Sequence, residues 1–532
     1  MQHLRRAAFA ATLAGTFLLG GFILPDRDAR GGADLFRDVL TLVSTRFVDT
    51  LEIGEVYERA AEGLVDRLDD PYAHLFTPEE LEEFTVAYEG HYAGVGMMIE
   101  SQQGSVVVRR VFPNTPAERN GVRIGDRVVR IDGESVDGWA LEKVSNTLKG
   151  EPGSKVQVRF IRYGVDDPLE VVITRAVVRI PAVPYATIVD GDVGYIPLQQ
   201  FNETSAREVE RSVQDLLRDG AKGLVLDLRG NGGGIVDQAV GIAGLFLPSG
   251  TAIAMQSERG SEERVYRNER EPVAAGVPLV VLIDGASASA SEIVAGALQD
   301  HDRAVILGTT SFGKGQVQTA YRLDGGYVLK MTVGKWFTPS GRTIHRDREV
   351  VDGRLVEVDD STHFAAGKAE RPEYRSDGGR VVYGGGGIMP DLEVTGDTLS
   401  TGERALLQAL LAHSQDYSIA VFDLASELQR GVQSDFEVTP EWRAELYRRL
   451  TERGVELDPE VWEGGASYID RELIYRVGQH AFGDAYVKTR VLDTDAQLVR
   501  AIDLIHSAGP DPRAMFGYIE ELRDAVRAGS SG

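Results

Sequence analysis

Apolar residues recur every three or four positions in two stretches near the start of the chain, residues 35–43 and 56–68. Residues with this spacing lie on one side of an α-helix. The pattern therefore predicts an N-terminal helical region over residues 31–88.

Short β-rich runs replace the helical pattern further along the chain. They occupy residues 95–100, 106–111, 127–132, 155–163 and 169–176, with short helices predicted at 114–119 and 139–149. In the order and spacing of these elements, residues 89–177 resemble a PDZ domain. The resemblance implies a β-barrel-like domain that adds a peptide as an extra strand and holds the peptide's terminal carboxylate in a nest of backbone amides.

A pair of glycines stands where a PDZ domain has its carboxylate-binding loop, just before the predicted edge strand. Two neighbouring glycines can also form an ordinary β-turn, but the order of the flanking elements favours the PDZ interpretation. The substrate-binding residues that the resemblance implies are Gly94, Val95, Gly96, Met97, Val144 and Leu148.

Beyond residue 180 the pattern alternates between strands and helices, which is typical of an α/β fold. Residues 401–532 show helical spacing alone. We therefore predict a multidomain α+β protein with N-terminal helices, a PDZ domain, an α/β core and an all-helical C-terminal appendix. The predicted boundaries are 1–30 for a signal peptide or membrane anchor, then 31–88, 89–177, 178–400 and 401–532 for these four parts.

The composition of the chain disfavours or excludes several classes of function. The chain has 532 residues, a net charge of −25 and no cysteine. Its acidic balance disfavours binding to nucleic acid, and the lack of cysteine excludes disulfides, thiolate metal sites and a cysteine nucleophile. No metal-ligand motif such as His-Glu-x-x-His occurs, so neither a metal nor a cofactor is expected.

The N-terminus carries an export signature. Arg5 and Arg6 precede an uncharged stretch, residues 7–24, which Pro25 and Asp26 end. The stretch is either an uncleaved anchor or a cleaved signal peptide. We expect a periplasmic protein, tethered to the inner membrane in the first case and secreted in the second.

Three stretches of the α/β region carry candidate chemistry. They are Asp-Leu-Arg-Gly-Asn-Gly-Gly-Gly at 227–234, Ser-Ala-Ser-Ala-Ser-Glu at 287–292 and Gly-Lys-Gly-Gln-Val-Gln at 313–318. The last stretch is not a nucleotide-binding P-loop, because Gly315 stands where a P-loop needs Ser or Thr and a strand follows instead of a helix. The nine histidines lie in no triad motif.

Together with the PDZ pattern, these motifs resemble the carboxyl-terminal processing proteases, also called tail-specific proteases, over residues 34–400. The resemblance implies a serine endopeptidase that acts through a Ser/Lys dyad and an acyl-enzyme. It places the nucleophile at Ser289, the general base at Lys314, the residue that orients the lysine at Gln318, and the oxyanion-hole amides at Gly233 and Ala290. Because a lysine accepts a proton only in its neutral form, Lys314 requires an apolar enclosure, to which Phe312 and Val317 are the nearest contributors in sequence.

Two positions depart from the family pattern, with Asp284 in place of an asparagine and Ala286 in place of a glycine. Residues 345–383 form a predicted polar insertion. The alternatives are a PDZ scaffold that does not cut, against which the retained Ser289, Lys314 and Gln318 argue, and an ATP-driven machine. The expected partners are proteins with unstructured C-termini, and a homo-oligomer or adaptor bound through the C-terminal helices.

Overall fold

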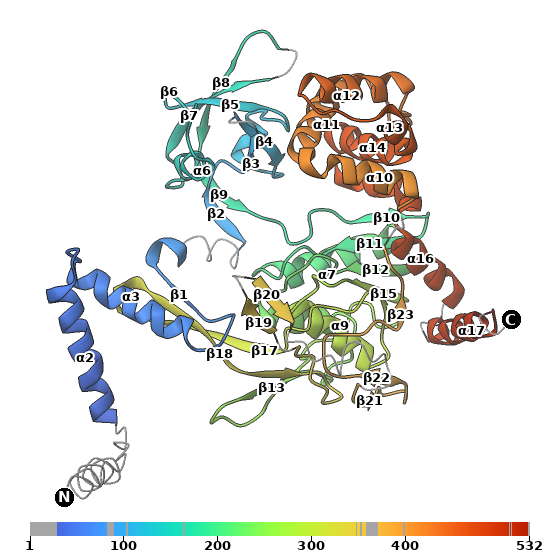
Figure 1. Cartoon of the computed structure of the whole chain (residues 1–532). Helices are drawn as coiled ribbons and strands as arrows, with labels where there is room; N and C mark the ends of the chain where they lie inside the picture. The colour runs from blue at the N-terminus through green and yellow to red at the C-terminus, as the bar shows by residue number, and fades with distance from the viewer. Residues whose placement is uncertain are drawn as a thin grey trace, which may run out of the picture. The chain divides into compact units, whose positions relative to one another are not determined.

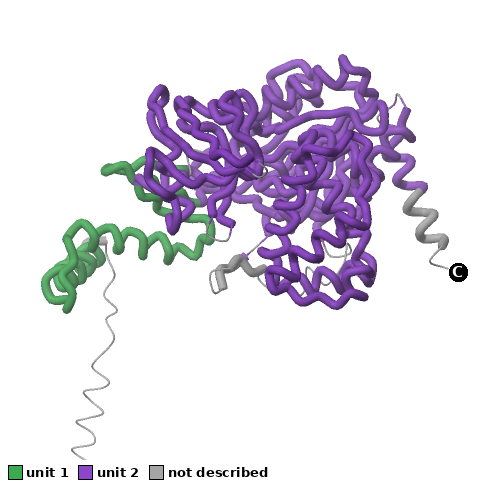
Figure 2. Tube along the Cα trace, turned by 90° about the horizontal axis from the view of Figure 1, so that it is seen from above, with its two compact units in different colours: residues 1–77, 320–331 green, residues 78–319, 332–532 purple. Residues whose placement is uncertain are grey.

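The computed structural model describes residues 29–81, 90–102, 105–162, 165–346, 348–351, 354–357, 371–396, 399–509, 511 and 513–529. The chain divides into two compact units (Figure 2), one made of residues 1–77 and 320–331 and the other of residues 78–319 and 332–532. Over the described ranges, no helix combines the length and apolarity that crossing a bilayer requires. The predicted signal or anchor segment lies outside the described residues.

The first unit contains two of the predicted N-terminal helices, α2 (Ala29–Arg46) and α3 (Ile53–Asp66), followed by strand β1 (His74–Phe76). β1 pairs antiparallel with the start of β18 (Val328–Phe337). The Tyr327 hydroxyl, just before β18, donates to Glu58 of α3 at 2.9 Å. This bond and the pairing of β1 with β18 join α3, β1 and the start of β18 into one unit.

The second unit begins with the PDZ domain, whose predicted strands and helices are confirmed (Figure 1). Its sheet has the order β3-β4-β5-β7-β8, with β6 beside β5, and a ribbon of β2 and β9 adjoins it. The elements are β2 (His91–Gly94), β3 (Met97–Gln102), β4 (Ser105–Val111), α5 (Pro116–Arg119), β5 (Arg127–Ile131), β6 (Glu134–Ser135), α6 (Leu141–Leu148), β7 (Lys155–Ile161), β8 (Leu169–Thr174) and β9 (Ala176–Arg179). β3 is an edge strand, with α6 beside it.

The α/β core is built on a sheet of order β10-β11-β12-β15-β16-β23, in which only the β10–β11 pair is antiparallel. Helices α7 (Ser205–Arg218), α8 (Val236–Gly244) and α9 (Ala290–Asp300) cover one face. The strands are β10 (Thr187–Val189), β11 (Val193–Pro197), β12 (Gly223–Asp227), β15 (Leu279–Ile283), β16 (Val305–Gly308) and β23 (Leu392–Glu393). A second sheet adds β13 (Ala252–Glu258), β14 (Arg264–Arg267) and β17 (Gln316–Arg322) to β18.

The helices of the predicted C-terminal region contribute to two separate hydrophobic cores. One bundle consists of α10 (Thr401–Leu410), α11 (Ser414–Leu428), α12 (Pro440–Glu452), α13 (Pro459–Gly464), α14 (Ala466–Phe482) and α15 (Asp484–Arg490). Helix α16 (Ala496–Ala508), followed by α17 (Ala514–Gly529), packs instead on the second face of the core sheet. A mostly parallel sheet has two apolar faces to cover, and the helices between its strands cover only one.

The predicted insertion contains two small hairpins among its described residues. They are formed by β19 (Arg348–Val351) with β20 (Arg354–Glu357), and by β21 (Glu373–Arg375) with β22 (Val381–Tyr383).

Candidate active site

The Ser-Ala-Ser-Ala-Ser run forms the turn between the buried strand β15 and the buried helix α9. Its outer serines are fully buried and bind backbone carbonyls, Ser287 Oγ donating to Leu228 at 2.8 Å and Ser291 Oγ to Asn231 at 2.9 Å. Ser289 between them is only half-buried. The outer serines therefore hold the turn, and the middle one is accessible to a substrate.

Ser289 has a strained backbone conformation, with φ 55° and ψ −110°. A non-glycine residue at positive φ persists only where its surroundings enforce it, and such residues cluster at functional sites. Ser289 also stands at the N-terminus of α9, where the helix dipole and free amides favour a negative oxygen. In the described part of the chain, the Ala290 N–H has no hydrogen-bond acceptor.

The predicted glycine loop lies against this turn. A Cβ on Gly233 would come within 2.7 Å of the Ala288 oxygen and 2.9 Å of the Ala290 nitrogen, and Gly233 has φ 98°, so only glycine fits there. The Gly233 N–H donates to Asn231 Oδ1 at 2.9 Å, while Asn231 Nδ2 donates to the Leu198 oxygen at 2.7 Å. The predicted oxyanion donor at Gly233 is therefore already hydrogen-bonded to an acceptor within the protein. The predicted donor at Ala290 has no such acceptor in the described part of the chain.

Lys314 follows strand β16 in the loop that leads into β17. Its Nζ donates to Gln318 Oε1 at 2.9 Å, so the structure brings the predicted base and its predicted orienting residue together. Lys314 is half-buried, and Val317 beside it is buried in the main core. The Phe312 N–H donates to the Ser287 oxygen at 2.9 Å, which ties this loop to the serine turn.

Glu292, fully buried in the first turn of α9, joins the serine turn to the lysine loop. Its Oε2 accepts from the backbone nitrogens of Ser289 and Lys314, each at 2.8 Å. Its Oε1 accepts from Ser311 Oγ at 2.6 Å and from the Gly313 nitrogen at 2.7 Å. Since one oxygen contacts both backbone nitrogens, those of Ser289 and Lys314 lie no farther apart than twice 2.8 Å.

Burial raises the pKa of Glu292, and the four hydrogen bonds that it accepts act in the opposite direction. The sequence interpretation did not assign Glu292 a role. A signal was present, because Ser289 followed three residues later by a glutamate has the spacing of a capping box. Nothing in that spacing indicated the second loop, which the order of strands β15 and β16 brings beside it.

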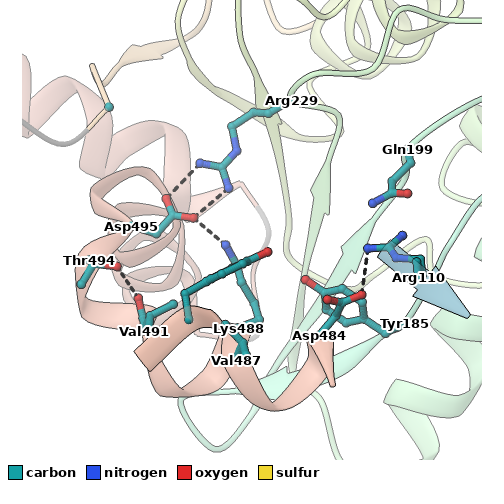
Figure 3. A pocket seen from close by; sticks show the side chains of 12 residues that line it. Arg110, Tyr185, Gln199, Arg229, Asp484, Val487, Lys488, Val491, Thr494 and Asp495 are labelled. Carbon is teal, nitrogen blue, oxygen red and sulfur yellow. Dashed lines mark hydrogen bonds and ion pairs between the residues drawn. The ribbon is translucent and has the colours of Figure 1, made fainter. Parts of the chain in front are cut away.

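A second group of side chains that the sequence did not predict is attached to Arg229, at the start of the glycine loop. Arg229 donates to both oxygens of Asp495, at 2.9 and 2.8 Å, and Asp495 also accepts from Lys488 at 2.6 Å (Figure 3). Burial opposes the charge of Arg229, but its ion pairs with Asp227 and Asp495 outweigh burial and raise its pKa. The C-terminal helices thereby support the loop that carries Gly233.

A cavity of about 380 Å³ lies beside this network, and Figure 3 labels most of the side chains that line it. On its far side, Arg110 of PDZ strand β4 pairs with Asp484 of α15 at 3.0 Å. The PDZ domain, the core and the C-terminal helices therefore all contribute to its wall, which includes Arg110, Tyr185, Gln199, Arg229, Tyr475, Asp484, Lys488 and Asp495.

The predicted peptide-binding residues lie around the start of β3. Gly96 has φ 90°, and the loop from Gly94 to Met97 is buried. Val144 and Leu148 lie on α6 and are buried in the PDZ core.

Two family models match the chain, a PDZ domain over residues 85–160 and peptidase family S41 over residues 192–352. The carboxy-terminal-processing protease of Bartonella bacilliformis is 35% identical over 313 residues, which cover 58% of this chain and 71% of that protein. The carboxy-terminal processing protease CtpA of Bacillus subtilis is 33% identical over 292 residues, covering 55% of this chain and 62% of that protein.

The chain is also similar to solved structures. The photosystem II D1 C-terminal processing protease is 30% identical with a TM-score of 0.35, covering 61% of this chain and 85% of that one. A PDZ domain followed by a peptidase core defines the class as serine-type peptidases. The chain belongs to the carboxy-terminal processing proteases of peptidase family S41.

Proposed function

We propose that this peptidase captures the free C-terminal tail of a protein substrate in its PDZ domain and cuts the chain with Ser289 and Lys314. The observation that carries the proposal is the Glu292 carboxylate, which binds the backbone nitrogens of both residues at 2.8 Å. A single buried side chain thus holds the backbones of two residues that are 25 positions apart in sequence close to each other.

In the proposed reaction, Ser289 Oγ attacks the carbonyl carbon of the scissile peptide bond while neutral Lys314 Nζ removes the hydroxyl proton. Protonated Lys314 then delivers that proton to the leaving nitrogen as the C–N bond breaks, leaving an acyl ester on Ser289. Water hydrolyses the ester by the reverse proton relay. Gln318, 2.9 Å from Lys314 Nζ, accepts a hydrogen bond and keeps the amine aimed along one direction.

Backbone amides stabilise the tetrahedral oxyanion in this proposal. Donors of this kind typically contribute about 3 to 4 kcal/mol each. The Ala290 N–H at the start of α9 supports this role, because it has no other acceptor among the described residues. A glycine-loop amide is the second donor, with Gly233 the predicted one.

The test is mass spectrometry of a disordered model substrate with an apolar C-terminus, incubated with the parent protein, Ser289→Ala and Lys314→Ala. We expect each variant to lose at least about 10³-fold in kcat. Ser257→Ala and Lys335→Ala, an exposed pair on strands β13 and β18, are the matched controls. Cleavage that continues unchanged in either dyad variant would refute the Ser/Lys assignment, and no cleavage by the parent would favour the PDZ scaffold.

We also propose that the protein works outside the cytoplasm, which rests on the uncharged stretch at residues 7–24. Cell fractionation with N-terminal sequencing of the mature protein tests this proposal. A periplasmic protein whose N-terminus is intact indicates the anchor, one trimmed after the stretch indicates a cleaved signal, and a cytoplasmic location contradicts export.

A further inference from the structure

The loop that carries Lys314 is held on its amide side by the serine turn and by Glu292. The Phe312 N–H donates to the Ser287 oxygen at 2.9 Å. The N–H groups of Gly313 and Lys314 donate to the Glu292 carboxylate at 2.7 and 2.8 Å. The carbonyl groups of the same loop need partners from another part of the chain, because buried peptide oxygens are hydrogen-bonded as regularly as the nitrogens.

The start of the predicted insertion supplies these partners. The backbone N–H of Arg346 donates to the Gly313 oxygen at 2.9 Å. Arg348, the first residue of β19, donates from its guanidinium to the Phe312 oxygen. The same guanidinium lies over the Phe312 ring, 3.7 Å from the ring centroid. Arg348 therefore contacts Phe312 through both its carbonyl group and its side chain.

Two glycines allow the insertion to approach the lysine loop this closely. A Cβ on Gly313 would come within 2.8 Å of the Arg346 Cβ, and a Cβ on Gly315 would come within 2.6 Å of the His345 nitrogen. The residues on either side of Lys314 thus face the insertion. Gly315, which excludes a P-loop, is the position against which the backbone of His345 packs.

The chain returns to the same place just beyond the far end of the insertion. The Gly387 N–H donates to the Ile344 oxygen at 2.8 Å, so the two ends of the insertion lie side by side. The Ile388 N–H donates to Ser311 Oγ at 2.6 Å, and the Ser311 N–H donates to the Ile388 oxygen at 3.0 Å. Both ends of the insertion are therefore attached to the loop that carries Lys314.

We infer that Arg348 is a positioning residue for Lys314, which it serves by holding Phe312 and so fixing the backbone from which the lysine side chain extends. The inference rests on the proposed role of Lys314 as the general base. A guanidinium suits this task because it is planar and has several donors, so it can stack on a ring and donate to a carbonyl oxygen at once. The predicted insertion is in this sense part of the active site.

The effect of losing this contact should appear in kcat. Arg348→Met keeps an apolar side chain against Phe312 and removes the charge and the donors. A displacement of Lys314 by a fraction of an ångström should lower kcat about tenfold. KM and the melting temperature should stay close to those of the parent, because Arg348 is proposed to act on the base and not on substrate binding.

A double-mutant cycle tests whether Arg348 acts through Phe312. Kinetics on the disordered model substrate are measured for the full-length parent, Arg348→Met, Phe312→Leu and the double variant. We expect each single variant and the double variant to lose about the same factor, near tenfold, because two residues in contact are not additive. The control is Arg375→Met, an exposed arginine of β21 in the same insertion, which should keep the parent kcat.

The cycle can overturn the inference in two ways. A normal kcat for Arg348→Met would show that the contact does not position the base, and a loss of about a hundredfold in the double variant would show that Arg348 does not act through Phe312. Lys314→Ala, measured beside them, tests the proposed function separately. If cleavage survives in Lys314→Ala, the dyad is refuted, and the inference fails with it.

A second measurement does not depend on activity. The chain has nine lysines, so selective ¹⁵N-lysine labelling gives nine backbone amide signals, and the loss of one in Lys314→Ala assigns the signal of Lys314. We expect Arg348→Met to shift this signal, because movement of the loop changes the hydrogen bond from the Lys314 N–H to Glu292. Arg375→Met should leave it unmoved. A Lys314 signal that does not respond to Arg348→Met would overturn the inference.

Discussion

The serine turn and the PDZ loop are the two proposed anion sites, and each presents backbone amides on a glycine-containing loop. At the serine turn, Asn231 Oδ1 accepts from the Gly233 nitrogen at 2.9 Å. At the PDZ loop, the Gly96 carbonyl accepts from the Phe112 nitrogen at 3.0 Å, so the Met97 amide of the same peptide group points to the opposite side.

The two loops differ in how their amides are held. Asn231 is fully buried, and its other amide atom donates to the Leu198 oxygen at 2.7 Å, so it cannot leave without breaking a buried hydrogen bond. The PDZ loop is fixed through its carbonyls instead, so its amides point away from those bonds. Asn231 is therefore a structural part of the glycine loop, whereas the PDZ amides are proposed to bind the ligand directly.

The largest effect is expected from Gly233→Ala. The new Cβ would lie 2.7 Å from the Ala288 oxygen at a φ of 98°, so the loop must move away from Ser289. We expect kcat to fall about 10²- to 10³-fold, the usual cost of losing an oxyanion-hole donor. Steady-state kinetics on a short peptide measures this change.

The same loop offers the control. A Cβ at Gly232 meets nothing within 4 Å, and its φ is not in the left-handed region, so Gly232→Ala should keep kcat near the parent value. Conversely, Gly96→Ala would place a Cβ 2.2 Å from Thr115 and should abolish tail binding while sparing kcat on the short peptide. Equal kcat for the Gly233 and Gly232 variants would break the comparison at its catalytic end.

Glu292→Gln should have the next largest effect, a fall in kcat of about 10²-fold. The amide group of glutamine puts an N–H₂ where an oxygen now accepts two hydrogen bonds, and each buried donor left unsatisfied costs about 1–3 kcal/mol. Peptide affinity at the PDZ domain should stay unchanged, as should all properties of the exposed control Glu263→Gln. A normal kcat with a normal melting temperature would show that the carboxylate does not align Ser289 with Lys314.

Asn231→Ala tests the structural role of Asn231 directly. Because Asn231 supports the glycine loop, its removal should lower kcat about tenfold and lower the melting temperature, through loss of the bonds to Gly233 and Leu198. Peptide affinity at the PDZ domain should stay unchanged. A rise in kcat for Asn231→Ala would mean that Asn231 is displaced during the reaction.

Most of the architecture could be predicted because the spacing of apolar and polar residues within each segment indicates whether it forms a helix or a strand. Alternating runs identified the PDZ strands, and the buried strands before 227 and 283 predicted where the glycine loop and the serine turn begin. The contact of Lys314 with Gln318 was predicted from the family resemblance and not from a local pattern.

Contacts between residues far apart in the sequence could not be predicted from these patterns. Glu292 acts on the lysine loop because parallel strands β15 and β16 end at the same edge. The pairing of Arg229 with Asp495 joins residues 266 positions apart. Helix α16 has an ordinary amphipathic pattern that does not reveal its partner.

The smallest effect is expected from pH, and it concerns the stability of the C-terminal helical bundle. His480 of α14 lies against Phe422, and burial together with the charges of Arg476 and Arg109 lowers its pKa from 6.5 to about 4. In the unfolded chain His480 therefore binds a proton near pH 6.5, whereas in the folded chain it stays neutral down to about pH 4. Stability must fall as pH drops below about 6.5, down to the folded pKa near 4.

Between pH 8 and pH 6 this loss should be about 1 kcal/mol. Thermal melting of the parent and of His480→Gln at these two pH values checks it, with His413→Gln as the control from the same helical region. The His480 variant should lose less stability than the parent and the control. Because His480 of the folded chain stays neutral between these pH values, this titration should change neither kcat on the short peptide nor tail binding. An equal loss of stability in the parent and in His480→Gln would contradict the low pKa of His480 in the folded chain.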